Sequence, residues 1–435
     1  MVGTFKLSKF WRPFLAMPIL TPYGCVAEKS QSERLNASPV NIAVRSLPAE
    51  MSTRAPVLGE SRKSVTQTSS ENIVSGQNAP SRPVRNVVVD WNRGCAIMSD
   101  RSLWCWGATG HGAPVAYCQG PCLAPKKVEL GMPVLEVAMD DTSTCVLLSD
   151  GRVDCASDRN PRTFFRQASG LVQGRPSSGV LTGRKNLVTH GSNHDGQLGF
   201  SVDTAQKKQP VLPLQQVQVG DKVREAFIGT LFGCSLSGDG KLRCFGNGFG
   251  CSGPQPVNVP GGVRRIRGAG SAMCVLTVDR RLFVVHEYQR GLPNGVIADC
   301  DFERFDLDQL FSSPLATDIV DAACYDWPGS NRGLGSGCAI NQEGNAFCWR
   351  DGVGRGPVEG DPYKVLPMRS LPPIRQVSVG LDFACAVTTS DRLLCWGSNK
   401  YGQLGRGYTS DTWESVPAEP AWPVPTVAES QTMPP

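Results

Sequence analysis

The stretch CAVTTSDRLLCWGSNKYGQLG, residues 385–405, holds two cysteines ten positions apart. The second cysteine, Cys395, is followed directly by Trp396 and Gly397, and a glycine-rich segment comes next. The same spacing of ten occurs at four other places in the chain. The five pairs are Cys95 with Cys105, Cys145 with Cys155, Cys234 with Cys244, Cys338 with Cys348, and Cys385 with Cys395. A spacing kept five times indicates one structural unit that repeats along the chain.

Each pair encloses the pattern of a β-hairpin. In the second copy, Ser149, Asp150 and Gly151 form a three-residue loop with glycine at the left-handed position. Such a loop places Cys145 opposite Cys155, with Cβ atoms about 4.5–5.5 Å apart, and a small adjustment brings them to the roughly 3.8 Å of a disulfide. The five pairs are therefore predicted to be disulfides within hairpins. Gly240, Gly344 and Asp391 take the same turn position in other copies, where Arg101 fits less well.

Two further copies lack the pair. Gly179 and Thr189 stand at both cysteine positions of one copy, and Val284 stands opposite Cys274 in the other. The seven first positions are 95, 145, 179, 234, 274, 338 and 385. Their mean spacing of about 48 residues predicts an all-β fold made by radial repetition of a four-stranded unit.

The bulk composition supports many short strands and excludes some functions. The chain of 435 residues holds 47 glycines and 33 prolines, and its net charge of +5 is mild. No run of Lys and Arg marks a nucleic-acid surface, so we expect no nucleic-acid partner. No catalytic or cofactor motif is present, and no cofactor or metal is expected. The zinc alternative is confined to Cys118 and Cys122 with His111, because ten-residue spacing does not suit zinc.

The two ends of the chain lack the repeat pattern. Residues 1–25 resemble an export signal, and Cys25 follows Gly24 as in a bacterial lipoprotein. The alternative is a disordered N-terminus with a stray cysteine. Residues 26–84 are interpreted as a disordered tether, 85–420 as the repeat domain and 421–435 as a proline-rich tail. Five disulfides imply an oxidising compartment, so an extracytoplasmic location is expected, with the cytoplasm as the alternative.

The motif Cys-Trp-Gly-Ser-Asn-Lys-Tyr-Gly-Gln-Leu-Gly resembles the regulator of chromosome condensation repeat family, as do "GSNHDGQLG" at 191–199 and "IRQVSVG" at 374–380. This resemblance implies a seven-bladed β-propeller over roughly residues 85–420. It also implies, through the best-known family activity, guanine-nucleotide exchange on a GTPase. The cysteine-paired copies resemble secreted bacterial members, whose scaffold is similar to that of beta-lactamase inhibitory protein II.

Several residues have a structural and a functional interpretation. Trp106, Trp349 and Trp396 each follow a repeat cysteine, and recurrence at one position favours packing between blades over ligand binding. Gln197 and Gln403 lie in Gly-Gln-Leu-Gly segments and are expected to hold these turns.

The longest interval between repeats contains "ADCDFERFDLDQLF", residues 298–311. Phe302 and Phe305, with Leu310 and Phe311, are candidate partner-binding residues, because long loops in compact folds are often functional. The alternative is that they cover an edge of the propeller or plug its end. A Cys300–Cys324 disulfide would fix the base of this excursion under either interpretation.

Together these features predict a non-enzymatic, monomeric, protein-binding propeller. It would be exported and held at a surface through Cys25, and its partner would be a protein of unknown identity. The alternatives are a nucleotide-exchange-like regulator of a small GTPase, an extracellular enzyme inhibitor, or an enzyme that uses the central cavity.

Overall fold

The computed structural model describes residues 82–108, 122–139, 143–157, 162–172, 174, 177–201, 212–246, 251–286, 315–326, 335–349 and 365–423. The chain divides into two units, Met1–Ile73 and Val74–Pro435, and every described residue belongs to the second. All regular elements in these ranges are strands, which confirms the all-β prediction. The described part of the chain contains no helix that is long and apolar enough to cross a membrane.

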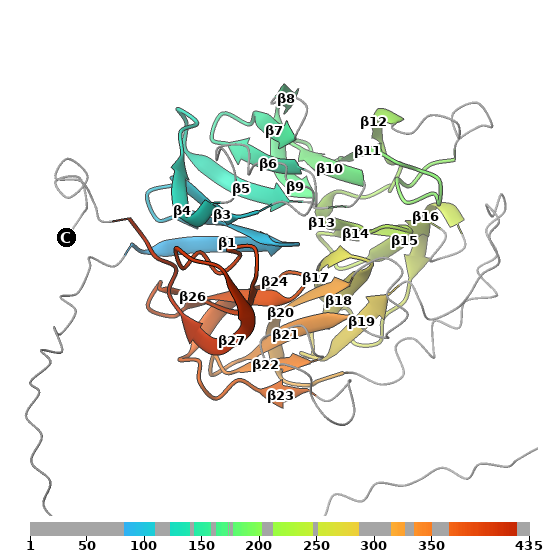
Figure 1. The fold of residues 1–435 in the computed structure, drawn as a ribbon. Helices are drawn as coiled ribbons and strands as arrows, with labels where there is room; N and C mark the ends of the chain where they lie inside the picture. The colour runs from blue at the N-terminus through green and yellow to red at the C-terminus, as the bar shows by residue number, and fades with distance from the viewer. Residues whose placement is uncertain are drawn as a thin grey trace, which may run out of the picture. The chain divides into compact units, whose positions relative to one another are not determined.

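The strands fall into consecutive groups, which we call blades and number along the chain (Figure 1). Blade 1 has β1 (Val84–Asp90), β2 (Arg93–Met98), β3 (Leu103–Gly107) and β4 (Cys122–Val128). Blade 2 has β5 (Val134–Met139), β6 (Ser143–Leu148), β7 (Val153–Ser157) and β8 (Arg162–Phe165). Blade 3 has β9 (Ala168–Val172), β10 (Ser177–Thr182), β11 (Leu187–Gly191) and β12 (Leu212–Gln216). Blade 4 has β13 (Val223–Ile228), β14 (Phe232–Ser237), β15 (Leu242–Gly246) and β16 (Cys251–Val257).

The remaining strands complete the domain. Blade 5 has β17 (Val263–Gly270), β18 (Ala272–Thr277) and β19 (Leu282–His286) within the described ranges. Blade 6 has β20 (Ile319–Asp326), β21 (Ser336–Asn341), β22 (Ala346–Trp349) and β23 (Leu366–Pro367). Blade 7 has β24 (Ile374–Val379), β25 (Phe383–Thr388), β26 (Leu393–Asn399) and β27 (Ser410–Ala418).

Five blades are separate four-stranded sheets, and blades 5 and 6 are joined in one sheet of seven strands. The join is a short parallel pairing, in which Ala269 faces Tyr325 and Gly270 faces Asp326. Seven blades as a count for the whole chain therefore stays a prediction. The second strand of every group carries one of the seven repeat positions predicted from the sequence.

The first strands of the blades form a closed ring. Each contacts the next, from β1 through β5, β9, β13, β17 and β20 to β24, and β24 contacts β1 again. Figure 1 shows this closure, with the blue β1 beside the red-orange strands of blade 7. Residues almost 300 positions apart thus lie side by side, as a propeller requires.

The hairpin turns fasten each blade to the next. In six blades the turn residue with positive φ offers its carbonyl oxygen to the first N–H of the next blade's inner strand. Val134 donates to Arg101 at 2.9 Å, and Val84 donates to Asp391 at 2.9 Å to close the ring. The other four pairs are Ala168 to Gly151, Val223 to Lys185, Ile319 to Arg280, and Ile374 to Gly344. Arg101 takes the left-handed conformation with φ 68°, so a side chain is accepted where glycine was expected.

The core lies between the blades, and the predicted packing role of the tryptophans is confirmed. Trp106 and Trp396 are fully buried in clusters that combine side chains of neighbouring blades. Trp106 faces Gly94 across the hairpin, and a Cβ at Gly94 would lie 2.5 Å from its ring. Gly337 makes the same space for Trp349. The glycine before a repeat cysteine therefore seats the aromatic residue after the second one.

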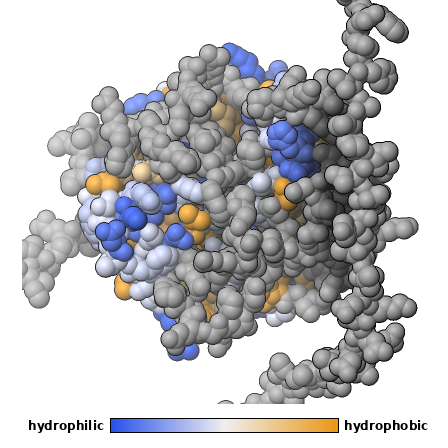
Figure 2. Space-filling model, turned by 45° about the vertical axis from the view of Figure 1, so that its right-hand side comes forward, coloured by the Kyte–Doolittle hydropathy of each residue, from blue (hydrophilic) through white to orange (hydrophobic). Residues whose placement is uncertain are grey.

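The described surface is mixed in polarity. On the face shown in Figure 2, hydrophilic residues alternate with small apolar areas. The exposed large apolar side chains come from blades 2, 3, 5 and 7 or the segments beside them: Met132, Leu135, Leu214, Val278, Tyr401, Tyr408 and Val416. Single exposed apolar residues are normal on protein surfaces and mark no docking site by themselves.

Candidate functional site

The candidate site is the central cavity, which the inner strands of all seven blades line. Its volume is about 330 Å³. Its wall is mixed: polar atoms make up the larger part of the exposed lining, and apolar side chains such as Val88 and Leu171 contribute to the rest. The charged residues of the described wall are Glu136 of β5 and Arg267 of β17. The cavity is thus of a size that admits a side chain or a short segment of extended chain.

A β-bulge at the second residue of the inner strand, which is skipped in the pairing register, shapes the wall of this cavity. The bulge occurs in six of the seven strands, for example between Val134 and Glu136 and between Val223 and Glu225. Bulges redirect side chains, and here they turn the third residue toward the neighbouring blade. Leu171 N–H donates to Glu136 Oε2 at 2.7 Å, and Ile266 N–H donates to Glu225 Oε2 at 2.9 Å.

Burial affects the protonation of Glu136, whose carboxylate accepts the hydrogen bond from Leu171. Desolvation raises the pKa of Glu136, against the opposing effects of the hydrogen bond from Leu171 and the charge of Lys185. An elevated carboxyl pKa is also a property of catalytic acids. A catalytic acid needs a partner nucleophile or base within reach, and no second carboxyl or histidine shares the described wall of the cavity with Glu136. We therefore assign Glu136 to the junction between blades 2 and 3.

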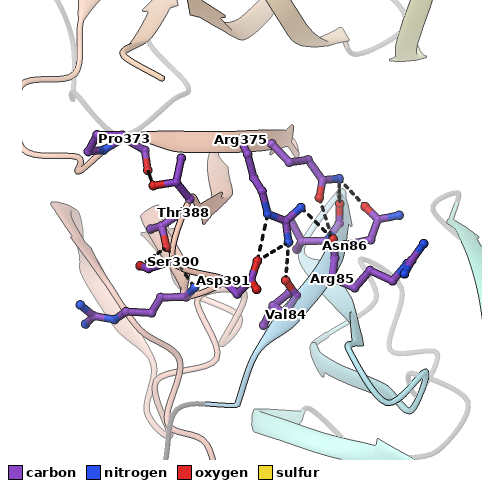
Figure 3. A network of polar contacts seen from close by, with 12 residues as sticks. Val84, Arg85, Asn86, Pro373, Arg375, Thr388, Ser390 and Asp391 are labelled. Atoms are coloured by element: carbon purple, nitrogen blue, oxygen red, sulfur yellow. Dashed lines mark hydrogen bonds and ion pairs between the residues drawn. The ribbon is translucent and has the colours of Figure 1, made fainter. Parts of the chain in front are cut away.

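The ring closes at the junction of blades 7 and 1 through the same third position (Figure 3). Gln376 bonds the backbone of Val87 in both directions, accepting from its N–H at 3.2 Å and donating to its carbonyl at 2.9 Å. Arg375 bridges from the Asp391 carboxylate, at 2.9 Å, to the carbonyl oxygens of Val84 and Arg85. These side chains and the backbone bond from Val84 to Asp391 close the junction, since blades 7 and 1 share no β-strand pairing among the described residues.

At the junction of blades 5 and 6, an ion pair takes the place of the hydrogen bond that Glu or Gln accepts at other junctions. Arg265 occupies the third position of β17, and its guanidinium lies 2.9 Å from the carboxylate of Asp321 in β20. Arg267 approaches the same carboxylate at 3.8 Å. Asp321 is almost fully buried, so this paired arrangement avoids leaving a carboxylate without a partner.

The predicted hairpin disulfides are present in the structure. In every one the two cysteines face each other across their hairpin, with Cα atoms 4.0–4.1 Å apart. Cys95 is bonded to Cys105, Cys145 to Cys155, Cys234 to Cys244, Cys338 to Cys348, and Cys385 to Cys395.

The two altered copies also keep the predicted register. Gly179 faces Thr189, and Cys274 faces Val284. The hairpin therefore forms with or without its disulfide, because the turn and the strand pairing set the register.

The predicted partner of Cys324 is wrong. Cys324 is bonded to Cys274 of β18, with a Cα separation of 5.7 Å, and not to Cys300. Val284 leaves Cys274 without a hairpin partner, and the packing of β18 against β20 brings Cys324 to it. The bond therefore links blades 5 and 6 directly. Cys122 is also disulfide-bonded.

The turn glutamines have the predicted role. Gln403 Oε1 accepts from Tyr401 N–H at 2.8 Å, and Gln197 Oε1 accepts from Asp195 N–H at 3.0 Å. The carbonyl of Gln403 also accepts from the Trp106 ring N–H at 2.8 Å, so its loop anchors blade 7 to blade 1.

Other predicted residues lie outside the described residues. They are Cys25, the candidate partner-binding residues Phe302, Phe305, Leu310 and Phe311, and the His111 and Cys118 members of the cysteine–histidine group with Cys122. Within the described ranges, no group of three or more metal-binding side chains is present.

A set of arginines at the mouth of the cavity was not predicted from the sequence. Arg85, Arg224, Arg264 and Arg375 are the second residues of β1, β13, β17 and β24, and all are exposed. The signal was available in the sequence, as an arginine after the first Val or Ile of each of these strands.

The repeats match known proteins. Models described as the regulator of chromosome condensation (RCC1) repeat match residues 374–403 and 390–430. The human protein "Regulator of chromosome condensation" is 23% identical over 352 residues, which cover 71% of this chain and 70% of the relative. The human "RCC1-like G exchanging factor-like protein" is 28% identical over 310 residues, or 63% of this chain and 62% of the relative, less than two thirds of its length.

A solved structure supports the fold. The crystal structure of human WBSCR16 is similar with a TM-score of 0.57 at 18% identity, covering 74% of this chain and 95% of that one. Likeness at this identity concerns the fold alone. The matched residues, 374–430, span blade 7, and the relatives extend the similarity to the regulator of chromosome condensation repeat over 71% of this chain.

Proposed function

We propose that this chain is an exported, non-enzymatic propeller that binds another protein. The observation that carries the proposal is the repeated fastening of neighbouring blades around a cavity without a catalytic group in its described wall. Turn carbonyls, third-position side chains and disulfides hold the inner strands in place. A rigid scaffold of this kind suits recognition, because little conformational entropy is lost when a partner binds.

The cysteines support an oxidising compartment. Six disulfides are formed in the described part of the chain, and such density is typical of exported proteins. Attachment to a surface through Cys25 belongs to the same proposal and rests on the sequence alone.

The experiment is a pull-down from native envelope and medium fractions, with partners identified by mass spectrometry. Alkylation of the isolated protein before reduction shows which of its cysteines are free thiols. A specific protein partner together with blocked hairpin cysteines supports the proposal. Free thiols at all five hairpin pairs in native material would refute export, and failure to retain any protein above a scrambled-bait control would refute binding.

The second candidate is regulation of a small GTPase. It is favoured by the similarity to the RCC1-like G exchanging factor-like protein. The test is release of fluorescent GDP from a panel of small GTPases. Acceleration by the protein in reducing buffer would favour this candidate over the first, whereas unchanged release rates across the panel would reject it.

A further inference from the structure

The exposed arginines at the cavity mouth share one place in the repeat. Each immediately follows the first residue of its inner strand and precedes the cavity-lining stretch by one or two residues. The four arginines therefore stand at one end of the cavity, on the side of the hairpin turns. They come in two neighbouring pairs, Arg375 with Arg85 in blades 7 and 1, and Arg224 with Arg264 in blades 4 and 5.

Within each pair, the side chain of the first arginine is hydrogen-bonded to the backbone of the second, and the side chain of the second makes no such contact among the described residues. Arg375 donates to the carbonyl of Arg85, and Arg224 donates to the carbonyl of Arg264. Within the described chain, neither the Arg85 nor the Arg264 guanidinium makes a hydrogen bond or an ion pair. Figure 3 shows the Arg85 side chain extending away from the contacts of Arg375. Each pair thus presents one guanidinium that is available to a ligand.

We propose that this mouth binds an acidic, extended segment of a partner protein, with carboxylates on the arginines and an apolar side chain in the cavity. The inference rests on the proposed function, because it names the surface and chemistry of that binding. Guanidinium groups match carboxylates in fork geometry, and exposed arginines keep their charge at any physiological pH.

The size of the cavity behind the arginines favours an extended peptide over a folded element as the ligand. Its wall offers Val88 and Leu171 to one apolar side chain among polar groups, and its volume of about 330 Å³ is too small for a folded element. Extended chain carries both kinds of group at spacings that alternate along its length.

The charge distribution disfavours a nucleic acid as the ligand. Single-stranded nucleic acids need a continuous basic groove with aromatic platforms. Here the equivalent positions in blades 2, 3 and 6 are Leu135, Ser169 and Val320. Acidic groups also stand between the arginines, since Asp391 lies 2.9 Å from Arg375 and Glu225 lies 3.7 Å from Arg224. Discrete carboxylates suit this pattern better than a regular phosphate chain.

The test is fluorescence anisotropy with a labelled hexapeptide, Asp-Glu-Asp-Leu-Asp-Glu, titrated with the full chain. The double variant Arg85→Glu with Arg264→Glu removes the two free guanidiniums without removing an internal contact. We expect its affinity to fall about tenfold or more. The matched control is Lys126→Glu with Arg369→Glu, which changes the net charge equally at exposed residues away from the inner strands, and we expect a change below about twofold.

Three outcomes would overturn the proposal. They are equal losses in both double variants, equal binding of an Asn/Gln version of the peptide, and tighter binding of a single-stranded oligonucleotide of the same charge. Melting curves of both variants check that the fold is kept. A partner from the pull-down that still binds the variant with Arg85→Glu and Arg264→Glu would refute this site and leave the proposed function standing.

Discussion

Glu136 provides a direct test of the junction between blades. Two uncharged replacements separate its hydrogen bond from its charge. Glu136→Gln keeps an acceptor for Leu171 N–H, as Gln376 does for Val87 at the equivalent position of blade 7. Glu136→Ala removes the acceptor. The two variants are equal in charge, so their difference in stability measures the hydrogen bond.

The expected difference follows from the partial burial of this hydrogen bond. Leaving a buried N–H without a partner costs about 1–3 kcal/mol. With an unfolding entropy of roughly 2.1 cal/mol/K per residue, a domain of about 340 residues loses roughly 1.4 °C of melting temperature per kcal/mol. Glu136→Ala should therefore melt about 1.5–4 °C below Glu136→Gln, as measured by differential scanning fluorimetry and by urea unfolding.

The charge of the Glu136 carboxylate has a separate effect, which appears in the pH dependence of the protein's stability. Folding raises the pKa of Glu136, so the folded state binds the proton more tightly than the unfolded state. This contribution to stability is fully present below the ordinary pKa and is lost as the pH rises through the folded pKa. Relative to wild type, Glu136→Gln should gain stability as the pH rises from the ordinary carboxyl pKa through the raised pKa of the folded state. Parallel pH profiles for the two proteins, or equal melting of the Gln and Ala variants, would refute the reasoning.

Further perturbations test the disulfides and the packing. Replacing Cys145 and Cys155 by valine should cost about 3 kcal/mol by the loop-entropy relation, or about 4 °C, and leave partner binding intact, because blade 3 lacks the pair. Replacing Cys274 and Cys324 by alanine should cost more, about 4 kcal/mol, since that bond closes a longer loop of the chain. Gly337→Ala should cost about 1–3 kcal/mol, because its Cβ would lie 2.0 Å from the Trp349 ring.

Matched measurements decide each of these predictions. Urea unfolding gives the free energies, and non-reducing peptide mapping confirms which bonds are present. Gly238→Ala is the control for Gly337→Ala, because a Cβ at Gly238 meets nothing within 4 Å. Equal effects of the two alanines would contradict the packing of Trp349. A smaller cost for the Cys274–Cys324 bond than for the Cys145–Cys155 bond would contradict the loop-length argument.

The features that could be predicted from the sequence are those that depend on neighbouring residues within one repeat. The ten-residue spacing fixes which cysteine faces which, since register within a hairpin depends on a few adjacent residues. It did not predict the bond between Cys274 and Cys324, because that pairing depends on how two blades pack. The acceptor role of Glu136 was missed for the same reason, as its partner Leu171 belongs to the next blade. The arginines at the cavity mouth left a repeated signal that becomes meaningful only once the inner strands are known to form a ring.

The closure of the ring has a consequence for how such a domain can be rearranged. Each described blade is made from consecutive residues, and the junction of blades 7 and 1 uses the same turn carbonyl and third-position side chain as other junctions. The described ends also meet, since Arg82 donates to the carbonyl of Pro423 at 3.4 Å. Among the described strands, no pairing depends on where the chain starts. A circular permutant that joins these ends and opens the chain at the exposed Gly220, between blades 3 and 4, should therefore rebuild the same ring.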